Sequence, residues 1–209
     1  MENNLFYAFV SRCIIYPLFK CFFRGKVHGY FNIPQKGSLI VVSNHGSHLD
    51  PPLLGHALGR PIGFMAKAEL FKIPILEYLI RQLGAYPVKR GGSDRDAIRM
   101  ASERLSRGLA TGVFLDGSRQ DNGRINNPMN GAAFLSARTN SLLLPVAIIN
   151  SHRALRSGSF LPRFVPIHIY IGKPLPPPNS KKKLDLELRT KQLQNSINNM
   201  IDNFNSETK

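Results

Sequence analysis

The chain has 209 residues, a length that suits one sizeable domain and excludes two ordinary domains joined by a linker. Hydrophobic residues make up 43% of it, which excludes global disorder, and its 2 cysteines are too few for a disulfide framework. There are 28 lysines and arginines against 13 acidic residues, and the resulting net charge of +15 favours nucleic acid, an anionic membrane surface or a phosphorylated substrate as partner.

The first predicted element is an almost wholly apolar segment from Leu5 to Phe23. Arg12 and Lys20 interrupt it, so the chain lacks the long uncharged run of a confident membrane span. Glu2 is the only charge before it and no small-residue cleavage site follows, which disfavours a secretory signal. We therefore expect residues 1–26 to form a monotopic anchor at the membrane interface. A core helix packed on the domain and a true span are the alternatives.

Residues 27–175 alternate between predicted strands and helices. Strands are expected at 38–44, 62–67, 85–89, 112–115, 141–149 and 165–172, and helices at 51–58, 74–84, 93–108 and 130–138. Asp50 is expected to cap the first of these helices. This order predicts a single α/β domain with a mostly parallel central sheet flanked by helices.

The remaining segment, residues 176–209, is expected to be a proline linker followed by an amphipathic helix packed on the domain. The prolines stiffen the linker. After it, Leu193, Ile197 and Ile201 recur at helical spacing, which predicts one buried face.

The strongest local signal for chemistry is the pair His45 and Asp50, which directly follows a predicted buried strand. On one continuous helix the two side chains would point apart, so they meet only if the chain turns at Gly46 and a new helix begins at Pro51. A carboxylate that accepts one imidazole N–H leaves the other ring nitrogen free to act as a base. No Ser or Cys nucleophile motif accompanies the pair, so the hydroxyl to be activated should belong to the substrate.

Three alternatives stay open for this region. Asp50 could only cap a helix while His45 only satisfies backbone groups. His48 is a second candidate base, with only two positions between it and Asp50. A zinc site built from His45, His48, Asp50 and His56 is also conceivable, although no cysteine pair or HExxH pattern supports it, and we expect no metal.

Cationic residues follow the other predicted strands. Lys67 ends one strand, Arg90 follows another, and Arg119 follows a third within a turn that also contains Asp116, Gly117 and Ser118. Fork-shaped donors and glycine-exposed amides suit a phosphate group. Ordinary surface charge is the alternative for any one of these cations.

Taken together, these ordered blocks resemble the glycerolipid acyltransferases, and most of all the 1-acyl-sn-glycerol-3-phosphate acyltransferase (PlsC-like) type. The blocks are Asn44-His45-x4-Asp50, Lys67-Ala68-Glu69-Leu70, Gly84-Ala85-Tyr86-Pro87-Val88-Lys89-Arg90, Phe114-Leu115-Asp116-Gly117-Ser118-Arg119 and Leu144-Pro145-Val146. Two blocks depart from the family pattern: Asp116 and Ser118 stand where the family usually has Glu and Thr, and Lys89 stands where an acidic residue usually precedes the arginine.

The resemblance implies an O-acyltransferase that moves a fatty acyl group from an acyl carrier protein or acyl-CoA to the sn-2 hydroxyl of lysophosphatidic acid, giving phosphatidic acid. It implies that His45 and Asp50 are catalytic. It also implies that Lys67, Arg90, Asp116, Gly117, Ser118 and Arg119 form the phosphate-binding side of the site. No cofactor is expected. A peripheral or monotopic location on the cytoplasmic side of an anionic membrane follows from the same reading.

Three alternative functions remain at this point. The first is an acyltransferase for another lysolipid or a glycerol-phosphate acceptor, which the Asp116 departure keeps open. The second is a basic nucleic-acid-binding protein, although no such motif is present and we expect no nucleic-acid partner. The third is a lipid-binding protein without catalysis, against which the intact His45–Asp50 pair argues.

Overall fold

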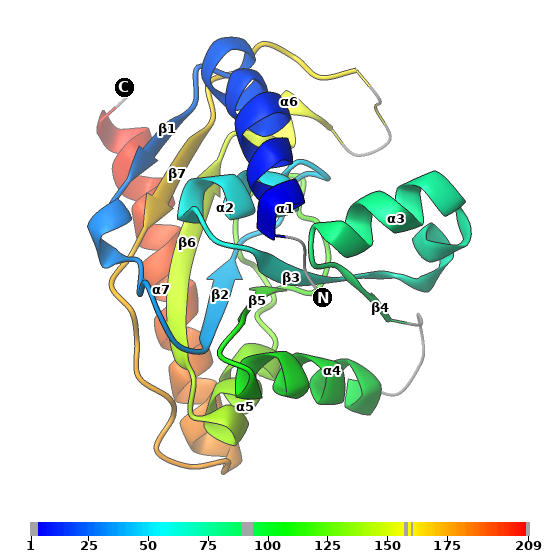
Figure 1. Ribbon diagram of the computed structural model, residues 1–209. Coiled ribbons are helices and arrows are strands. Elements are labelled where there is room, and N and C mark those ends of the chain that lie inside the picture. Colours follow the sequence, from blue (N-terminus) through cyan, green and yellow to red (C-terminus); the bar gives the residue numbers. More distant parts are fainter. Residues whose placement is uncertain (1–3, 89–93, 157–158, 160, 208–209) are drawn as a thin grey trace.

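The computed structural model describes residues 4–88, 94–156, 159 and 161–207. Its centre is a seven-stranded sheet in the order β1-β7-β6-β2-β5-β3-β4 (Figure 1). The strands are β1 (Lys26–His28), β2 (Leu39–Ser43), β3 (Ile62–Lys67), β4 (Tyr86–Val88), β5 (Ala110–Phe114), β6 (Leu142–Ile149) and β7 (His168–Ile171). All neighbouring strands pair in parallel except β6 and β7, so the predicted fold class is confirmed.

Helices surround this sheet. They are α1 (Asn4–Val10), α2 (Asp50–Leu58), α3 (Pro74–Gln82), α4 (Asp94–Ser106), α5 (Gly131–Thr139), α6 (Ser151–Ala154) and α7 (Lys183–Glu207). Shorter helical turns are η1 (Ser11–Ile15), η2 (Leu18–Phe22), η3 (Tyr30–Asn32) and η4 (Ala68–Lys72). The three-residue strand β1 and the single turn α6 were not predicted, because segments this short carry too little periodicity. Ser93, the first residue of the helix predicted over 93–108, lies outside the described residues.

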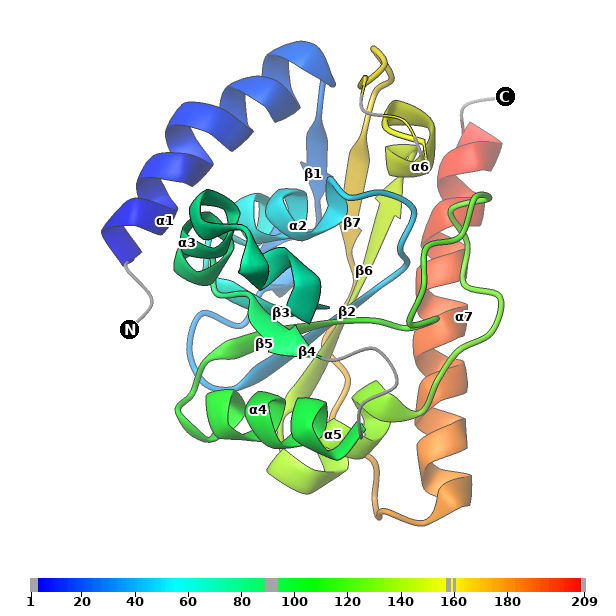
Figure 2. The same ribbon diagram turned by 90° about the vertical axis from the view of Figure 1, so that its right-hand side faces the viewer.

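Side chains of β2 alternate between the two faces of the sheet, so each face has its own apolar core. Leu39 and Val41 join one core together with Leu53 and Leu54 of α2 and with Phe19 of the N-terminal segment. Ile40 and Val42 join the other core, which contains side chains of α4, α5 and α7. The result is a three-layer sandwich in which α1 and α7 lie on opposite sides of the sheet (Figure 2).

The N-terminal segment is one helical run that begins as α1 and continues through η1 and η2. It rests on α2 by one side: the Ser11 hydroxyl lies 2.9 Å from Nδ1 of His56, and the Tyr7 hydroxyl donates to the carbonyl of Arg60. Leu5–Phe22 is long and apolar enough to cross a membrane, by length and composition only, and just 11% of this window is buried. The segment thus packs on the domain by one side, where Phe19 and Phe23 enter the core, while most of its length is not buried.

The C-terminal helix α7 packs on β6 and α5 through one buried face, which includes Leu193, Ile197 and Ile201. Polar side chains of the same helix reach the loop that follows β5. This placement agrees with the periodicity of its sequence.

Candidate active site

The carboxyl end of β2 lies at a point where the connections of two neighbouring strands diverge. β2 pairs in parallel with β5 on one side and with β6 on the other. The helix after β2, α2, covers one face of the sheet, whereas the helix after β5, α5, covers the opposite face. Open α/β sheets bind their ligands in the crevice at such a switch point. The turn 44–50 and the loop 116–129 both lie there.

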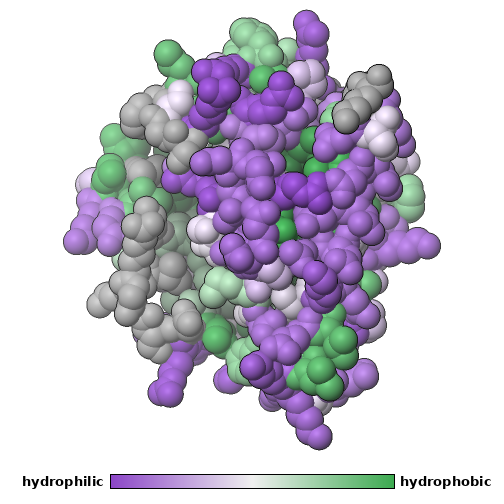
Figure 3. Space-filling view, turned by 180° about the vertical axis from the view of Figure 1, so that it is seen from behind, coloured by the Kyte–Doolittle hydropathy of each residue, from purple (hydrophilic) through white to green (hydrophobic). Residues whose placement is uncertain are grey.

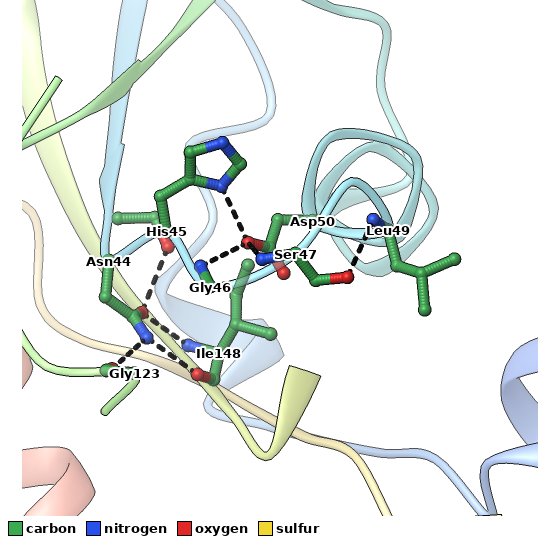
Figure 4. Close-up of polar contacts among 9 residues, drawn as sticks. Asn44, His45, Gly46, Ser47, Leu49, Asp50, Gly123 and Ile148 are labelled. Carbon is green, nitrogen blue, oxygen red and sulfur yellow. Dashed lines mark hydrogen bonds and ion pairs between the residues drawn. The ribbon is translucent and has the colours of Figure 1, made fainter. Parts of the chain in front are cut away.

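His45 and Asp50 meet across this turn (Figure 4). Nδ1 of His45 lies 2.8 Å from Oδ2 of Asp50, so the carboxylate accepts the Nδ1–H and Nε2 is the nitrogen that can accept a proton. The imidazole side chain is 16% exposed and stacks on the ring of Phe114, the last residue of β5, with 3.8 Å between ring centroids. The ring is therefore held on one side by a carboxylate and on one face by an aromatic side chain.

Asp50 is fully buried and works as an anchor for the whole turn. Its Oδ2 also accepts the backbone N–H groups of Gly46 and Ser47, each at 2.8 Å, whereas its Oδ1 is buried without a partner among the described residues. The expectation that Asp50 caps α2 is wrong in detail, because Leu49 is the N-cap and Asp50 is the first helical residue. Since its carboxylate takes both amides, Gly46 and Ser47 cannot also donate these N–H groups to a substrate oxyanion.

Asn44 fixes the start of the turn, and sequence reasoning gave it no role of its own. Its side-chain amide accepts the N–H of Ile148 and donates to the carbonyls of Ile148 and Gly123, each bond being 2.7 or 2.8 Å long. The side chain thus continues the hydrogen bonding of β2 with β6 for one more residue and ties the turn to the loop after β5. A buried amide directly after an apolar strand is the sequence signal for such a role, because it must find partners there.

The loop 116–129 lies against the His45 turn. The amide of Gln120 donates to the carbonyl of His45 at 2.8 Å. Within the loop, the Asp116 carboxylate accepts the N–H groups of Asn126 and Asn127, and Gly117 takes a positive φ of 66°. Asp116 therefore closes its own loop, and the tight turn at Gly117 brings the following residues toward His45.

Some of the predicted phosphate-binding residues lie near the His45 turn, and the side chains of others lie outside the described part of the structure. Arg119, half-buried, directly precedes Gln120 and is thus next to the His45 turn, and Ser118 is exposed beside it. Lys67 is the last residue of β3, and its side chain lies outside the described part of the chain, as does the whole of Arg90. The described structure therefore brings four members of this set to the end of the sheet that carries His45 and Asp50: Asp116, Gly117, Ser118 and Arg119.

The histidines of the alternative zinc site do not assemble. Among the described residues, no group of three or more His, Cys, Asp or Glu side chains could hold a metal ion. His56 faces the N-terminal segment, where it contacts Ser11 and the rings of Tyr16 and Phe19. His48, the other candidate base, is exposed.

The helix α7 holds the far side of the loop 116–129. Ile125, buried at 2% exposure, donates its N–H to the Asn198 side chain at 3.1 Å, and its carbonyl accepts from Asn198 and Gln194 at 3.0 and 3.1 Å. One residue earlier, Arg124 forms a two-pronged ion pair with Asp202. The loop that faces His45 is thus clamped to the last helix of the chain.

Another histidine, His152, packs between the turn 44–50 and the loop 116–129. A Cβ added at Gly46 would lie 2.8 Å from the Cβ of His152, and one added at Gly123 would lie 2.4 Å from its Nδ1, so only glycine fits at both contacts. Burial, followed by the charge of Arg153, lowers the pKa of His152, while Asp50 and Asp121 act against this shift. Burial between the two segments therefore favours the neutral form of this ring.

Comparisons with known proteins agree with this geometry. The Acyltransferase family profile matches residues 24–149, which include both loops. A chloroplastic 1-acyl-sn-glycerol-3-phosphate acyltransferase of Arabidopsis thaliana is 30% identical over 148 residues, covering 69% of this chain but 40% of that protein. The 1-acyl-sn-glycerol-3-phosphate acyltransferase of Borreliella burgdorferi is 25% identical over 71% of this chain and 60% of its own length. This chain thus spans about half the length of these curated relatives.

Among solved structures, the 1-acyl-sn-glycerophosphate acyltransferase PlsC of Thermotoga maritima has a similar fold. The TM-score is 0.71 at 25% sequence identity, and the match covers 91% of this chain and 85% of that one. The similarity therefore extends well beyond the segment matched by the family profile.

Proposed function

Because the chain belongs to the Acyltransferase family, we propose that it transfers a fatty acyl group from a thioester to the free hydroxyl of lysophosphatidic acid, giving phosphatidic acid. The observation that carries this proposal is the contact between His45 Nδ1 and the buried Asp50 carboxylate, which leaves Nε2 to accept a proton. The names of the Arabidopsis and Borreliella relatives support the choice of acceptor.

In the proposed reaction, Nε2 of His45 removes the proton from the acceptor hydroxyl. The hydroxyl oxygen then bonds to the thioester carbonyl carbon, the carbon–sulfur bond breaks, and the thiolate leaves with the proton returned by His45. Asp50 holds the ring in the required tautomer and stabilises the imidazolium. A thiol with a pKa of about 8.5 is a good leaving group, so activation of the acceptor is the demanding step and no acyl-enzyme is required.

The loop 116–129 and the ends of β3 and β4 form the proposed binding side for the acceptor phosphate. Lys67, Arg90 and Arg119 would supply the cationic donors. Asp116 and Gly117 would shape the loop, and Ser118 would add a hydroxyl at its tip. Asp116 supports this division of roles, since its carboxylate already accepts two amides of the loop.

Four finer statements belong to the same proposal. The donor is an acyl carrier protein or acyl-CoA, and the acylated position is sn-2. The N-terminal residues 1–26 hold the protein on an anionic membrane as a monotopic anchor. The protein lies on the cytoplasmic side, where its donor is found. The exposed apolar side of this segment and the positive net charge of +15 support membrane attachment.

An acceptor panel tests this function. The detergent-solubilised full chain is assayed for thiol release with acyl-CoA and with acyl carrier protein as donors, against lysophosphatidic acid, glycerol 3-phosphate and neutral lysolipids. We expect the highest kcat/KM with lysophosphatidic acid. The matched control is His45→Ala protein. Transfer only to a different acceptor would overturn the assignment of the acceptor, and no acceptor-dependent release with any donor would overturn the activity itself.

A further inference from the structure

The helix α3 carries an apolar stripe that the protein leaves open to solvent. Ile75, Tyr78 and Leu79 are spaced i, i+3 and i+4, so they lie on one face of the helix, and they are 78%, 58% and 39% exposed. Ile73, just before the helix, is 53% exposed. An isolated exposed apolar residue is ordinary, but a contiguous set on one helix marks an interaction surface.

This stripe is continuous with the exposed side of the N-terminal segment. The ring of Tyr78 meets the ring of Phe6 edge-on, with 6.0 Å between their centroids. On the same segment Leu5 is 83% exposed and Phe9 is 60% exposed. Both ribbon views place α1 beside α3, on the outside of the same layer (Figures 1 and 2). Two elements far apart in the sequence therefore share one apolar surface, which we call the α1–α3 face.

The charges of the N-terminal half of the α1–α3 face indicate an anionic partner, and on α3 the carboxylate of Glu77 is paired with Arg81. The sequence has no acidic residue from position 3 to position 49, whereas Arg12, Lys20 and Arg24 lie within the N-terminal segment and are exposed. Long basic side chains beside apolar ones can reach the phosphates of lipids while their stems remain in the apolar layer. The side of the molecule opposite α1 is mainly hydrophilic, with only scattered apolar patches (Figure 3).

We propose that the α1–α3 face docks on the surface of an anionic bilayer, and that α3 is a second membrane contact besides the N-terminal segment. The proposal deepens the proposed function, because a lipid acceptor has to reach the enzyme from such a surface. A single interfacial helix leaves the protein free to rotate about the helix axis. A second contact on α3 removes this rotation and fixes how the sheet, and with it the His45 turn, stands relative to the lipid headgroups.

The absence of tryptophan from the chain allows a direct test. The Ile75→Trp protein is mixed with vesicles of phosphatidylglycerol and phosphatidylcholine, with and without bromine on the acyl chains. The matched control is Leu188→Trp, because Leu188 is 56% exposed on α7, on the other side of the sheet. We expect Trp fluorescence of the Ile75→Trp protein to shift to the blue and to be quenched by bromine, and that of the control to do neither. Bound Ile75→Trp protein without quenching would overturn the proposal.

A loss-of-binding pair gives a second measurement. Ile75→Ser combined with Tyr78→Ser is expected to weaken partition onto the same vesicles by about tenfold, as the loss of partly inserted apolar area implies. Leu184→Ser combined with Leu188→Ser, on exposed positions of α7, should leave the partition unchanged. Equal partition of the two double variants would contradict the proposal. So would a concentration-dependent dimer that buries the Trp of the Ile75→Trp protein without bromine quenching, since a second copy would then cover the face.

These readouts do not depend on acyl transfer. The His45→Ala protein should bind vesicles as the unchanged protein does. If the Trp of Ile75→Trp is quenched but the protein has no transferase activity, the α1–α3 face is supported and the proposed function is overturned. If the protein is active but the Trp is not quenched, the proposed function is supported and the docking of the α1–α3 face is overturned.

Discussion

In the turn 44–50 and in the loop 116–129, which meet at the end of the sheet, one aspartate accepts backbone amides, and these two aspartates, Asp50 and Asp116, do different things. Asp50 is fully buried and its Oδ2 accepts an imidazole N–H as well as two amides. Asp116 is partly exposed and accepts two amides of its own loop. The same side chain orients a titratable ring in one turn and closes a loop in the other. The role of such an aspartate is therefore not defined by its position after a strand. It is defined by the hydrogen-bond donors that surround its carboxylate.

The largest expected effect comes from removing the base itself. His45→Ala should lower kcat by at least about 10²-fold, the lower end for loss of a positioned general base. Thiol release by purified, detergent-solubilised protein measures it, and His48→Ala is the matched control on the same turn. Near-normal turnover of His45→Ala would remove His45 from the mechanism, and an equal loss in both variants would leave the assignment of the base to His45 without support.

The next change tests the carboxylate that orients the ring. Asp50→Asn should also lower kcat by at least about 10²-fold, because a side-chain amide can donate to Nδ1 and so shift the ring proton to Nε2. The thermal unfolding midpoint is recorded alongside, since the buried carboxylate also anchors two amides. A kcat close to that of the unchanged protein would show that Asp50 has only a structural role.

Asp116→Asn should separate the two aspartates. The amide has one acceptor oxygen where the carboxylate has two, so one loop amide loses its partner and the loop loosens. We expect KM for lysophosphatidic acid to rise several-fold, with kcat changed by about threefold or less. If Asp116→Asn lowered kcat as much as Asp50→Asn does, the difference between the two turns would not hold.

A smaller effect is expected from the outer support of the same loop. Asn198→Ala removes two hydrogen bonds to the backbone of Ile125, which are worth about 0.5–1.5 kcal/mol each. KM for the acceptor should rise by a smaller factor than in Asp116→Asn, with a lower unfolding midpoint. Asn199→Ala, on an exposed position of the same helix, is the control. An unchanged KM in Asn198→Ala would show that the clamp does not reach the site.

The smallest effect concerns pH at the junction of the two turns. The pKa of His152 is lowered from an unfolded value of about 6.5, so the stability that its neutral ring contributes is present above that pH and declines as pH falls through it. His152→Asn should therefore reduce the fall in unfolding midpoint between about pH 7.5 and about pH 5.5. Part of the fall will remain, because burial also lowers the pKa values of His28, His56 and His168. An unchanged acid sensitivity would exclude His152 as a contributor.

The layered fold and the His45 turn could be predicted from the sequence, because both depend on local patterns. β2 begins with four consecutive apolar residues, and Gly46 and Pro51 mark the turn and the new helix that let His45 and Asp50 meet. The roles of Asn44 and Asn198 were not predictable in this way. Each side chain finds its partners 73 to 104 residues away along the chain, so the position of Asn44 after an apolar strand signals that it needs partners but does not identify them, and Asn198 lacks even that signal.

The attachment of Ile125 to α7 also has a consequence for how this chain tolerates shortening. Asn198 and Asp202 lie in the C-terminal half of α7. Proteolysis or truncation there would leave the strands and the His45 side chain in place. It would remove the hydrogen bonds and the ion pair that hold the loop 116–129 on α7. A clipped protein should therefore be less stable, because Ile201 leaves the core, and should also recognise its substrate poorly.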